Sequence, residues 1–123
     1  MSKNKGKYDL ESRTIKFSED IIVFSRILTK DIITIPLVRQ LIRSATSIGA
    51  NYCEANGASS KKDFKNKIHI CKKEAKETKY WLQLIAKASP ENAEECRKYW
   101  KEAHELTMIF SKIIITMNSG KKN

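Results

Sequence analysis

Glu74 and Glu77 are the two residues whose types and spacing could do acid and base chemistry. Carboxylates three residues apart share one face of a helix, where one could donate and the other accept a proton. No nucleophile and no further acid on another element accompanies them. No glycine-rich loop does either, because Gly49 and Gly57 do not form a phosphate-binding pattern. We therefore expect no catalytic residues, and we interpret the two glutamates as structural.

The histidines and cysteines predict neither a metal centre nor a reactive thiol. His69 and His104 are isolated in the sequence, and nothing resembles the spacings H-E-x-x-H or C-x-x-C. Cys53, Cys71 and Cys96 lie in helical patterns without a visible activating group, so we expect small buried apolar residues in a reducing cytoplasm. No metal ion and no cofactor is expected.

A set of lysines without interspersed carboxylates is the strongest functional signal in the chain. Plotted on a helix, seven lysines fall within an arc of about 120° and extend over about 27 Å. We call this surface the lysine ridge, and its members are Lys61, Lys62, Lys65, Lys72, Lys73, Lys76 and Lys79. A solvated helix face usually mixes glutamate with lysine four residues apart, which the ridge does not. The ridge therefore predicts a nucleic-acid-binding surface that reads backbone and shape.

The composition supports an anionic partner. The 123 residues include 24 Lys and Arg against 14 Asp and Glu, a formal net charge of +10. Such an excess favours nucleic acid, an anionic surface or an acidic protein as partner. The basic ends, with Lys3, Lys5, Lys7, Lys121 and Lys122, are expected to be flexible and to assist binding.

No part of the sequence predicts a membrane segment. The basic start leads into no apolar region of the kind that a signal peptide has, and no apolar run approaches the length of a membrane span. We therefore expect a cytoplasmic protein without a membrane partner.

The elements that must position these residues are helices. Apolar residues recur at intervals of three, four and seven, which predicts helices over residues 10–29, 36–56, 60–88 and 90–118. Pro36 and Pro90 suit the first turn of a helix, Ser60 and Asp63 have the spacing of a helix cap, and Gly57 is a typical stop. Residues 1–123 are long enough for a single domain. The short connections predict an all-α fold, an antiparallel up-down four-helix bundle.

One face of the second predicted helix carries small polar residues and one arginine. We predict a structural and assembly cluster that joins this face to the third helix, and its members are Arg43, Ser47, Asn51, Glu54, Glu74 and Glu77. Gln40 and Ser44 lie beside it on the face away from the core. Arg43 is expected to pair with Glu74 or Glu77, either within one bundle or between subunits. Gly49, which costs about 1 kcal/mol relative to alanine in a helix, indicates close packing of a neighbouring helix.

Residues 39–55 resemble the bacterial four helix bundle proteins, also called 23S rRNA-intervening-sequence proteins, and the resemblance continues through residues 63–64 and 73–82. It implies an antiparallel bundle whose subunits assemble into ring-like homopentamers. The chain is also similar to the accessory variability determinant proteins of diversity-generating retroelements, which form pentamers and engage both nucleic acid and a reverse transcriptase. That similarity implies a nucleic-acid-binding role.

Two functions remain open at the level of sequence. The first is a non-enzymatic homopentamer that binds structured RNA or DNA through the lysine ridge. The alternative is a scaffold or adaptor whose basic surface binds an acidic protein partner, such as a reverse transcriptase or a ribosome-associated factor. Nucleic acid that copurifies with the protein would favour the first, and capture of a protein partner that survives nuclease treatment would favour the second.

Overall fold

The chain folds into a bundle of four long helices. The computed structural model describes residues 9–120, and the basic ends lie outside this range. Its helices are α2 (Leu10–Ile27), α3 (Thr34–Asn56), α4 (Lys61–Ala88) and α5 (Ala93–Gly120), and the 3-10 turn η2 (Pro90–Asn92) precedes α5. Residues 9–120 contain no strand, so the predicted all-α fold is confirmed.

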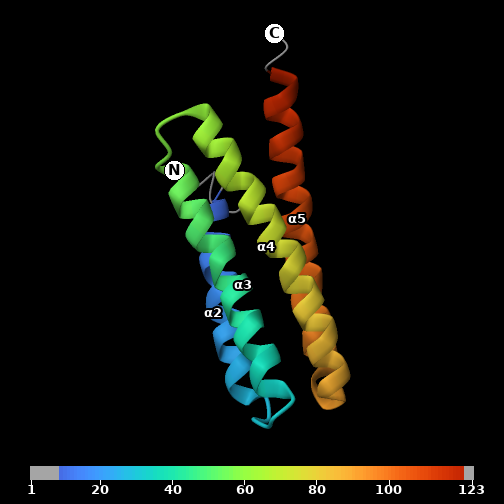
Figure 1. Ribbon diagram of the computed structural model, residues 1–123. Coiled ribbons are helices and arrows are strands. Elements are labelled where there is room, and N and C mark those ends of the chain that lie inside the picture. The colour runs from blue at the N-terminus through green and yellow to red at the C-terminus, as the bar shows by residue number, and fades with distance from the viewer. Residues whose placement is uncertain (1–8, 121–123) are drawn as a thin grey trace.

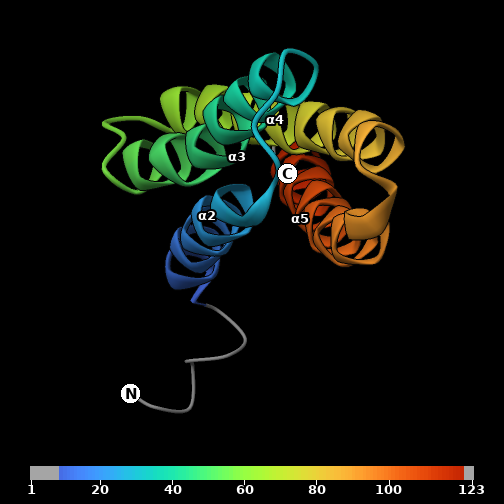
Figure 2. The same ribbon diagram turned by 90° about the horizontal axis from the view of Figure 1, so that it is seen from below.

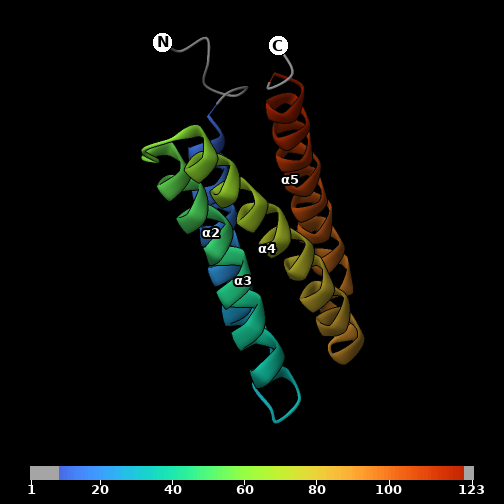
Figure 3. The ribbon, with the colours of Figure 1, turned by 45° about the horizontal axis from the view of Figure 1, so that its top comes forward.

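Consecutive helices run in opposite directions, as expected for an up-down bundle. In Figure 1, α2 and α3 form one pair of neighbours, and α4 and α5 form the other. Viewed along the bundle in Figure 2, α3 and α4 lie on one side, and α2 and α5 lie on the other. Figure 3 shows that α4 crosses beside α3 and then continues along α5. This central position brings α4 into contact with both neighbouring helices along its length.

The helix ends differ from the predicted boundaries by a few residues. The first helix ends at Ile27 instead of residue 29, and the last is split into η2 and α5, which ends at Gly120. The second helix begins at Thr34, two residues before Pro36, and this start is explained by Asp31. Its Oδ1 accepts hydrogen bonds from the backbone N–H groups of Ile33 at 2.9 Å and Thr34 at 2.8 Å. Because N–H groups of the first turn have no partner within the helix, proline is tolerated there.

The apolar stripes of the four helices meet in one core. Its buried side chains are Phe17, Ile21, Phe24, Leu28, Leu41, Ala45, Ile48, Ala55, Ile68, Cys71, Ala75, Leu82, Ile85, Cys96, Ala103, Leu106, Phe110 and Ile114. Half-buried apolar residues such as Phe64, Tyr52 and Trp100 pack against it. Helical periodicity located this core because each helix has a single continuous apolar stripe.

At Gly49, α2 packs closely against α3. A Cβ atom at this position would lie 3.4 Å from the backbone oxygen of Thr14 and 3.5 Å from its Oγ1. Both residues are buried. The predicted packing of a neighbouring helix against Gly49 is therefore confirmed, and the neighbour is α2.

Candidate nucleic-acid interface

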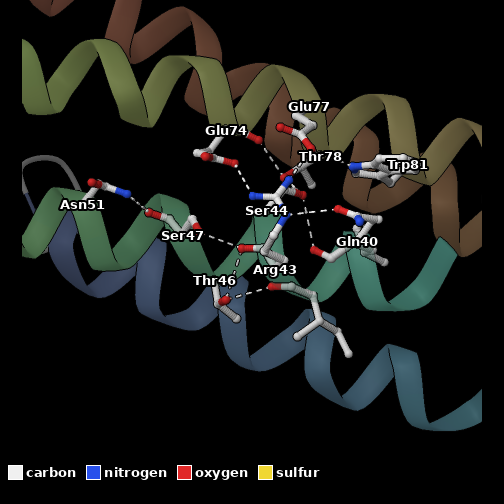
Figure 4. Close-up of polar contacts among 12 residues, drawn as sticks. Gln40, Arg43, Ser44, Thr46, Ser47, Asn51, Glu74, Glu77, Thr78 and Trp81 are labelled. Atoms are coloured by element: carbon white, nitrogen blue, oxygen red, sulfur yellow. Dashed lines mark hydrogen bonds and ion pairs between the residues drawn. The ribbon is translucent and has the colours of Figure 1, made fainter. Parts of the chain in front are cut away.

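Arg43 joins α3 to α4 through both glutamates that the sequence singled out. Its Nη1 lies 3.2 Å from Oε1 of Glu74, and its Nη2 contacts Oε2 of Glu77 within the same chain. Figure 4 shows the guanidinium between the two carboxylates, with Gln40 and Trp81 beside it. Arg43 Nε donates to Gln40 Oε1 at 3.0 Å, and Trp81 Nε1 donates to Glu77 Oε2 at 3.1 Å.

The Arg43 network is partly open to solvent. The side chains of Arg43, Glu74 and Glu77 are 44%, 11% and 32% exposed. Burial lowers the pKa of the Arg43 guanidinium, but its hydrogen bond with Glu77 and the charges of Glu77 and Glu74 outweigh burial and raise that pKa. The arginine is thus charged at all relevant pH values, and Glu74 is the partner with least access to water.

The other members of the predicted cluster do not reach the guanidinium. Ser47 Oγ donates to the backbone oxygen of Arg43, and Asn51 Nδ2 donates to the backbone oxygen of Ser47, so both bonds lie within α3. Glu54 instead accepts a hydrogen bond from Lys67 of α4 at 2.7 Å, which raises the pKa of Lys67. The structure brings together Arg43, Glu74 and Glu77, and it places Glu54 in a separate contact between the same two helices.

Ser44 occupies a different position from the one expected. The sequence placed it on a face away from the core, but the side chain is fully buried. Its Oγ lies 2.9 Å from Oγ1 of Thr78, which in turn donates to the backbone oxygen of Glu74. The expectation was wrong because α3 is covered on this side by α4, whose small polar side chain at position 78 supplies the hydrogen-bond partner.

The lysine ridge lies on the side of α4 that is shared with α5. Lys61, Lys62, Lys73 and Lys76 are exposed, and Lys65, Lys72 and Lys79 are half-buried beside α5. None of the seven forms an ion pair with a carboxylate of residues 9–120. The ridge therefore presents uncompensated positive charge.

Two ridge lysines contact polar residues of α5. Lys65 Nζ donates to Oδ1 of Asn118, and Lys79 Nζ lies 3.0 Å from Nδ1 of His104. At the end of the bundle where α4 begins, Lys61, Lys62 and Lys65 line an open hollow, which is closed on the α5 side by Met117 and Gly120. The surface is thus a groove between two helices, with lysines along one wall.

Sequence reasoning missed the opposite wall of this groove. Trp100 and His104 of α5 stack with their ring centroids 5.1 Å apart and their planes 13° apart, and Lys79 Nζ lies 4.9 Å from the centroid of the Trp100 ring. His104 was treated as isolated on the sequence alone, and Trp100 was not singled out. The signal that could have found them is their spacing with Arg97, because residues at i, i+3 and i+7 share one helix face.

The cysteines, and the other side chains that could bind a metal ion, are spread over the described part of the bundle. No three His, Cys, Asp or Glu side chains among residues 9–120 come close enough to hold a metal ion. Burial raises the pKa of Cys71 to about 12 and that of Cys96 to about 11, which disfavours the thiolate. Cys53 is exposed, contrary to the expectation, and its Sγ lies 3.5 Å from Oε2 of Glu11. Desolvation and this carboxylate raise the pKa of Cys53 as well.

No helix of residues 9–120 combines the length and apolar composition that crossing a membrane requires.

A protein-family model described as 23S rRNA-intervening sequence protein matches residues 7–113. A crystal structure from Bacteroides thetaiotaomicron, described as a protein of unknown function from the S23 ribosomal protein family, is 31% identical to the chain. That match covers 85% of this chain and 96% of the other, with a TM-score of 0.75. No curated protein sequence matches the chain.

Proposed function

This chain belongs to the 23S rRNA-intervening sequence protein family, and we propose that it is a non-enzymatic, homo-oligomeric protein of the cytoplasm that binds structured RNA or DNA through the lysine ridge. The observation that carries the proposal is the absence of carboxylate partners along the ridge. Among the other cationic side chains of residues 9–120, Arg13, Lys16, Arg43 and Lys67 each pair with a glutamate or an aspartate, and the rest, such as Arg26 and Lys101, do not; the ridge differs in gathering seven unpaired lysines on one helix. A helix face that keeps its charge uncompensated favours a phosphate-rich partner over a purely structural role.

The dimensions and chemistry of the ridge suit a nucleic-acid backbone. A length of about 27 Å is commensurate with several phosphates, since duplex DNA carries one charge per ~1.7 Å of its axis. Lysine presents a mobile point charge and lacks the planar fork with which arginine reads guanine. Binding through this surface is therefore expected to depend strongly on salt and weakly on base sequence.

The proposal includes assembly into a ring-like homopentamer, for which the family resemblance supplies the number of subunits. The end of the bundle between α2 and α3 supports self-association, because Val23, Ile27, Ile32 and Ile33 are all exposed there. Ile32 has 87% of its surface open to solvent. Apolar side chains gathered on a surface typically mark an interaction site. Five copies of the ridge would multiply the attraction to phosphate, and light scattering would measure the subunit number.

Nucleic-acid retention at different salt concentrations tests the function. Replacing Lys65, Lys72, Lys76 and Lys79 with glutamine removes four of the seven ridge charges. The matched control replaces Lys16, Arg26, Lys30 and Lys98 with glutamine, since these residues are exposed and lie outside the ridge. Both variants lower the formal charge from +10 to +6. Fluorescence anisotropy with a labelled RNA hairpin and a DNA duplex would give affinities, and circular dichroism would verify folding.

We expect the ridge variant to lose binding and the control variant to retain it. If each lysine contacts one phosphate, the slope of log K against log salt should become less steep by roughly 3 to 4 in the ridge variant. Equal loss in both variants would mean that net charge alone drives retention, and intact binding by the ridge variant would place the site elsewhere. Capture of an acidic protein that persists after nuclease treatment would favour the scaffold function instead.

A further inference from the structure

We propose that the groove between α4 and α5 binds an unpaired nucleotide of a single-stranded nucleic acid, with its base held beside Trp100 and its phosphates on the flanking cations. The inference rests on the proposed function and names the form of nucleic acid that the ridge would bind. In Figures 1 and 3, α5 begins beside the end of α4 and the two helices separate toward the start of α4, and Lys79 of the ridge contacts His104 of the aromatic pair. Three observations about this groove carry the inference.

The first observation is the arrangement of the aromatic pair. His104 covers one face of the Trp100 ring at nearly parallel orientation, and Lys79 lies close to both rings. Trp100 also packs against the hydrophobic core. Together, the stack, the lysine and the core restrict the rotation of the indole. A fixed aromatic ring at the surface loses little conformational freedom when a base stacks on it.

The second observation is a cavity that the same indole lines. It has a volume of about 240 Å³, and it is lined by Leu82, Gln83, Ala86, Ala93, Cys96, Arg97 and Trp100. Trp100 lines it, whereas His104 and Lys79 do not. Pockets that enclose drug-sized ligands measure roughly 300–1,000 Å³. The smaller cavity therefore suits a single flat ring system.

The third observation is the chemistry of the cavity wall. Apolar side chains form most of the lining, and no carboxylate contributes to it. Gln83 is exposed, and its amide has no hydrogen-bond partner among the side chains of residues 9–120, so it is free to meet the polar edge of a base. Arg97 is exposed at the mouth, and Lys79 lies one helical turn before Gln83. The combination of an apolar slot, a neutral amide and flanking cations matches a nucleotide better than an acidic peptide, which lacks a flat ring at fixed distance from its charge.

A continuous duplex cannot use this cavity, because its bases are stacked on one another and their faces are inaccessible. Single strands, loops and frayed ends expose the face of a base without that cost. The groove is consequently expected to prefer single-stranded over double-stranded nucleic acid, while the lysine ridge by itself would bind the phosphates of either form.

Fluorescence titration of the full chain tests the inference. The probes are a single strand of roughly 12 uridine nucleotides, a length within the range that such grooves accommodate, the deoxythymidine counterpart and a duplex of the same length. Two substitutions vary the ring, Trp100→Leu, which removes it, and Trp100→Phe, which keeps an aromatic face. Ala86→Leu fills the cavity while Trp100 stays in place. Circular dichroism and thermal melting verify the fold of each variant.

We expect stacking to quench the emission of Trp100 when either single strand binds. Trp100→Phe should retain affinity, because phenylalanine keeps an aromatic face. It should lose most of the quenching, because Trp81 is then the only tryptophan that emits. Trp100→Leu and Ala86→Leu should bind single strands roughly 5- to 100-fold more weakly, as expected for the loss of one stacked base, and bind the duplex unchanged. The Ala86→Leu result decides the outcome if Trp100→Leu does not fold.

The outcomes separate this inference from the proposed function. Equal binding of single strands and duplex, without quenching and without an effect of Ala86→Leu, would overturn the nucleotide site and leave the lysine ridge as a binding surface. Absence of binding to all three probes would overturn both. Quenching by single strands that disappears when the cavity is filled would establish the site.

Discussion

The ammonium of Lys79 in α4 lies 3.0 Å from Nδ1 of His104 in α5. The ammonium donates this hydrogen bond when Nδ1 of His104 carries no proton. His104 also stacks on Trp100. The contact thus joins the lysine ridge of α4 to an aromatic pair on α5. Cationic and aromatic side chains therefore lie next to each other between these two helices.

Removing the charge of Arg43 is expected to destabilise the bundle moderately. Arg43→Ala leaves Glu74, whose side chain is only 11% exposed, without its cationic partner. The loss of a hydrogen-bond partner by a buried polar group costs about 1–3 kcal/mol, and the partial exposure of Arg43 places the expected loss at the lower end. Glu77→Ala should cost less, because Arg43 keeps Glu74 as a partner. Urea unfolding of both variants would measure the difference, and light scattering would show whether assembly also depends on Arg43.

Gly49 should tolerate alanine but not a large side chain. A Cβ atom would meet Thr14 at 3.4 Å, which is ordinary van der Waals contact. Gly49→Ala is therefore expected to raise the free energy of unfolding by about 0.5–1 kcal/mol, the difference between the two residues within a helix. Gly49→Leu should lower it by roughly 1–3 kcal/mol, because it forces α2 away from α3. Thermal melting of the two variants would decide, and destabilisation by alanine would contradict the expected tolerance.

Asp31 should make the stability of the bundle depend on pH in the acid range. Its hydrogen bonds from the backbone N–H groups of Thr34 and Ile33 lower the pKa of the Asp31 carboxyl in the folded state. A lowered folded pKa stabilises the fold above the unfolded pKa of about 3.9, and this contribution is lost as the pH falls through the folded pKa. Urea unfolding at neutral pH and near pH 3 would measure the change. Asp31→Asn should show a smaller change than the original chain, and an identical pH dependence would contradict the role of Asp31.

Alkylation with iodoacetamide should distinguish the three cysteines in the folded protein. Burial raises the pKa of Cys71 to about 12 and that of Cys96 to about 11, so both should react only after unfolding. Cys53 is exposed and should be modified first. Because the Glu11 carboxylate contributes to the raised pKa of Cys53, Glu11→Gln should increase its rate of modification. Mass spectrometry would locate the label, and Cys53→Ser is the control that should remain unlabelled.

The sequence determined the architecture and the basic character of the central helix. Hydrophobic periodicity located the four helices and the core, since each apolar stripe can be buried in only one orientation. It also indicated that Gly49 meets a neighbouring helix and that Arg43 meets Glu74 or Glu77. The residues that a helix presents on one face follow from their spacing, and the pairing of Arg43 with a glutamate follows from their opposite charges.

Only the tertiary structure decided which residues of different helices share a surface. Ser44 became buried because α4 covers it, Cys53 remained exposed, and Trp100 and His104 joined the lysine ridge because α5 packs along α4. Spacing within one helix carries no information about the rotation and crossing of its neighbours, which depend on how side chains of both helices interdigitate. The second wall of the candidate site was accessible only once the packing of α4 against α5 was known.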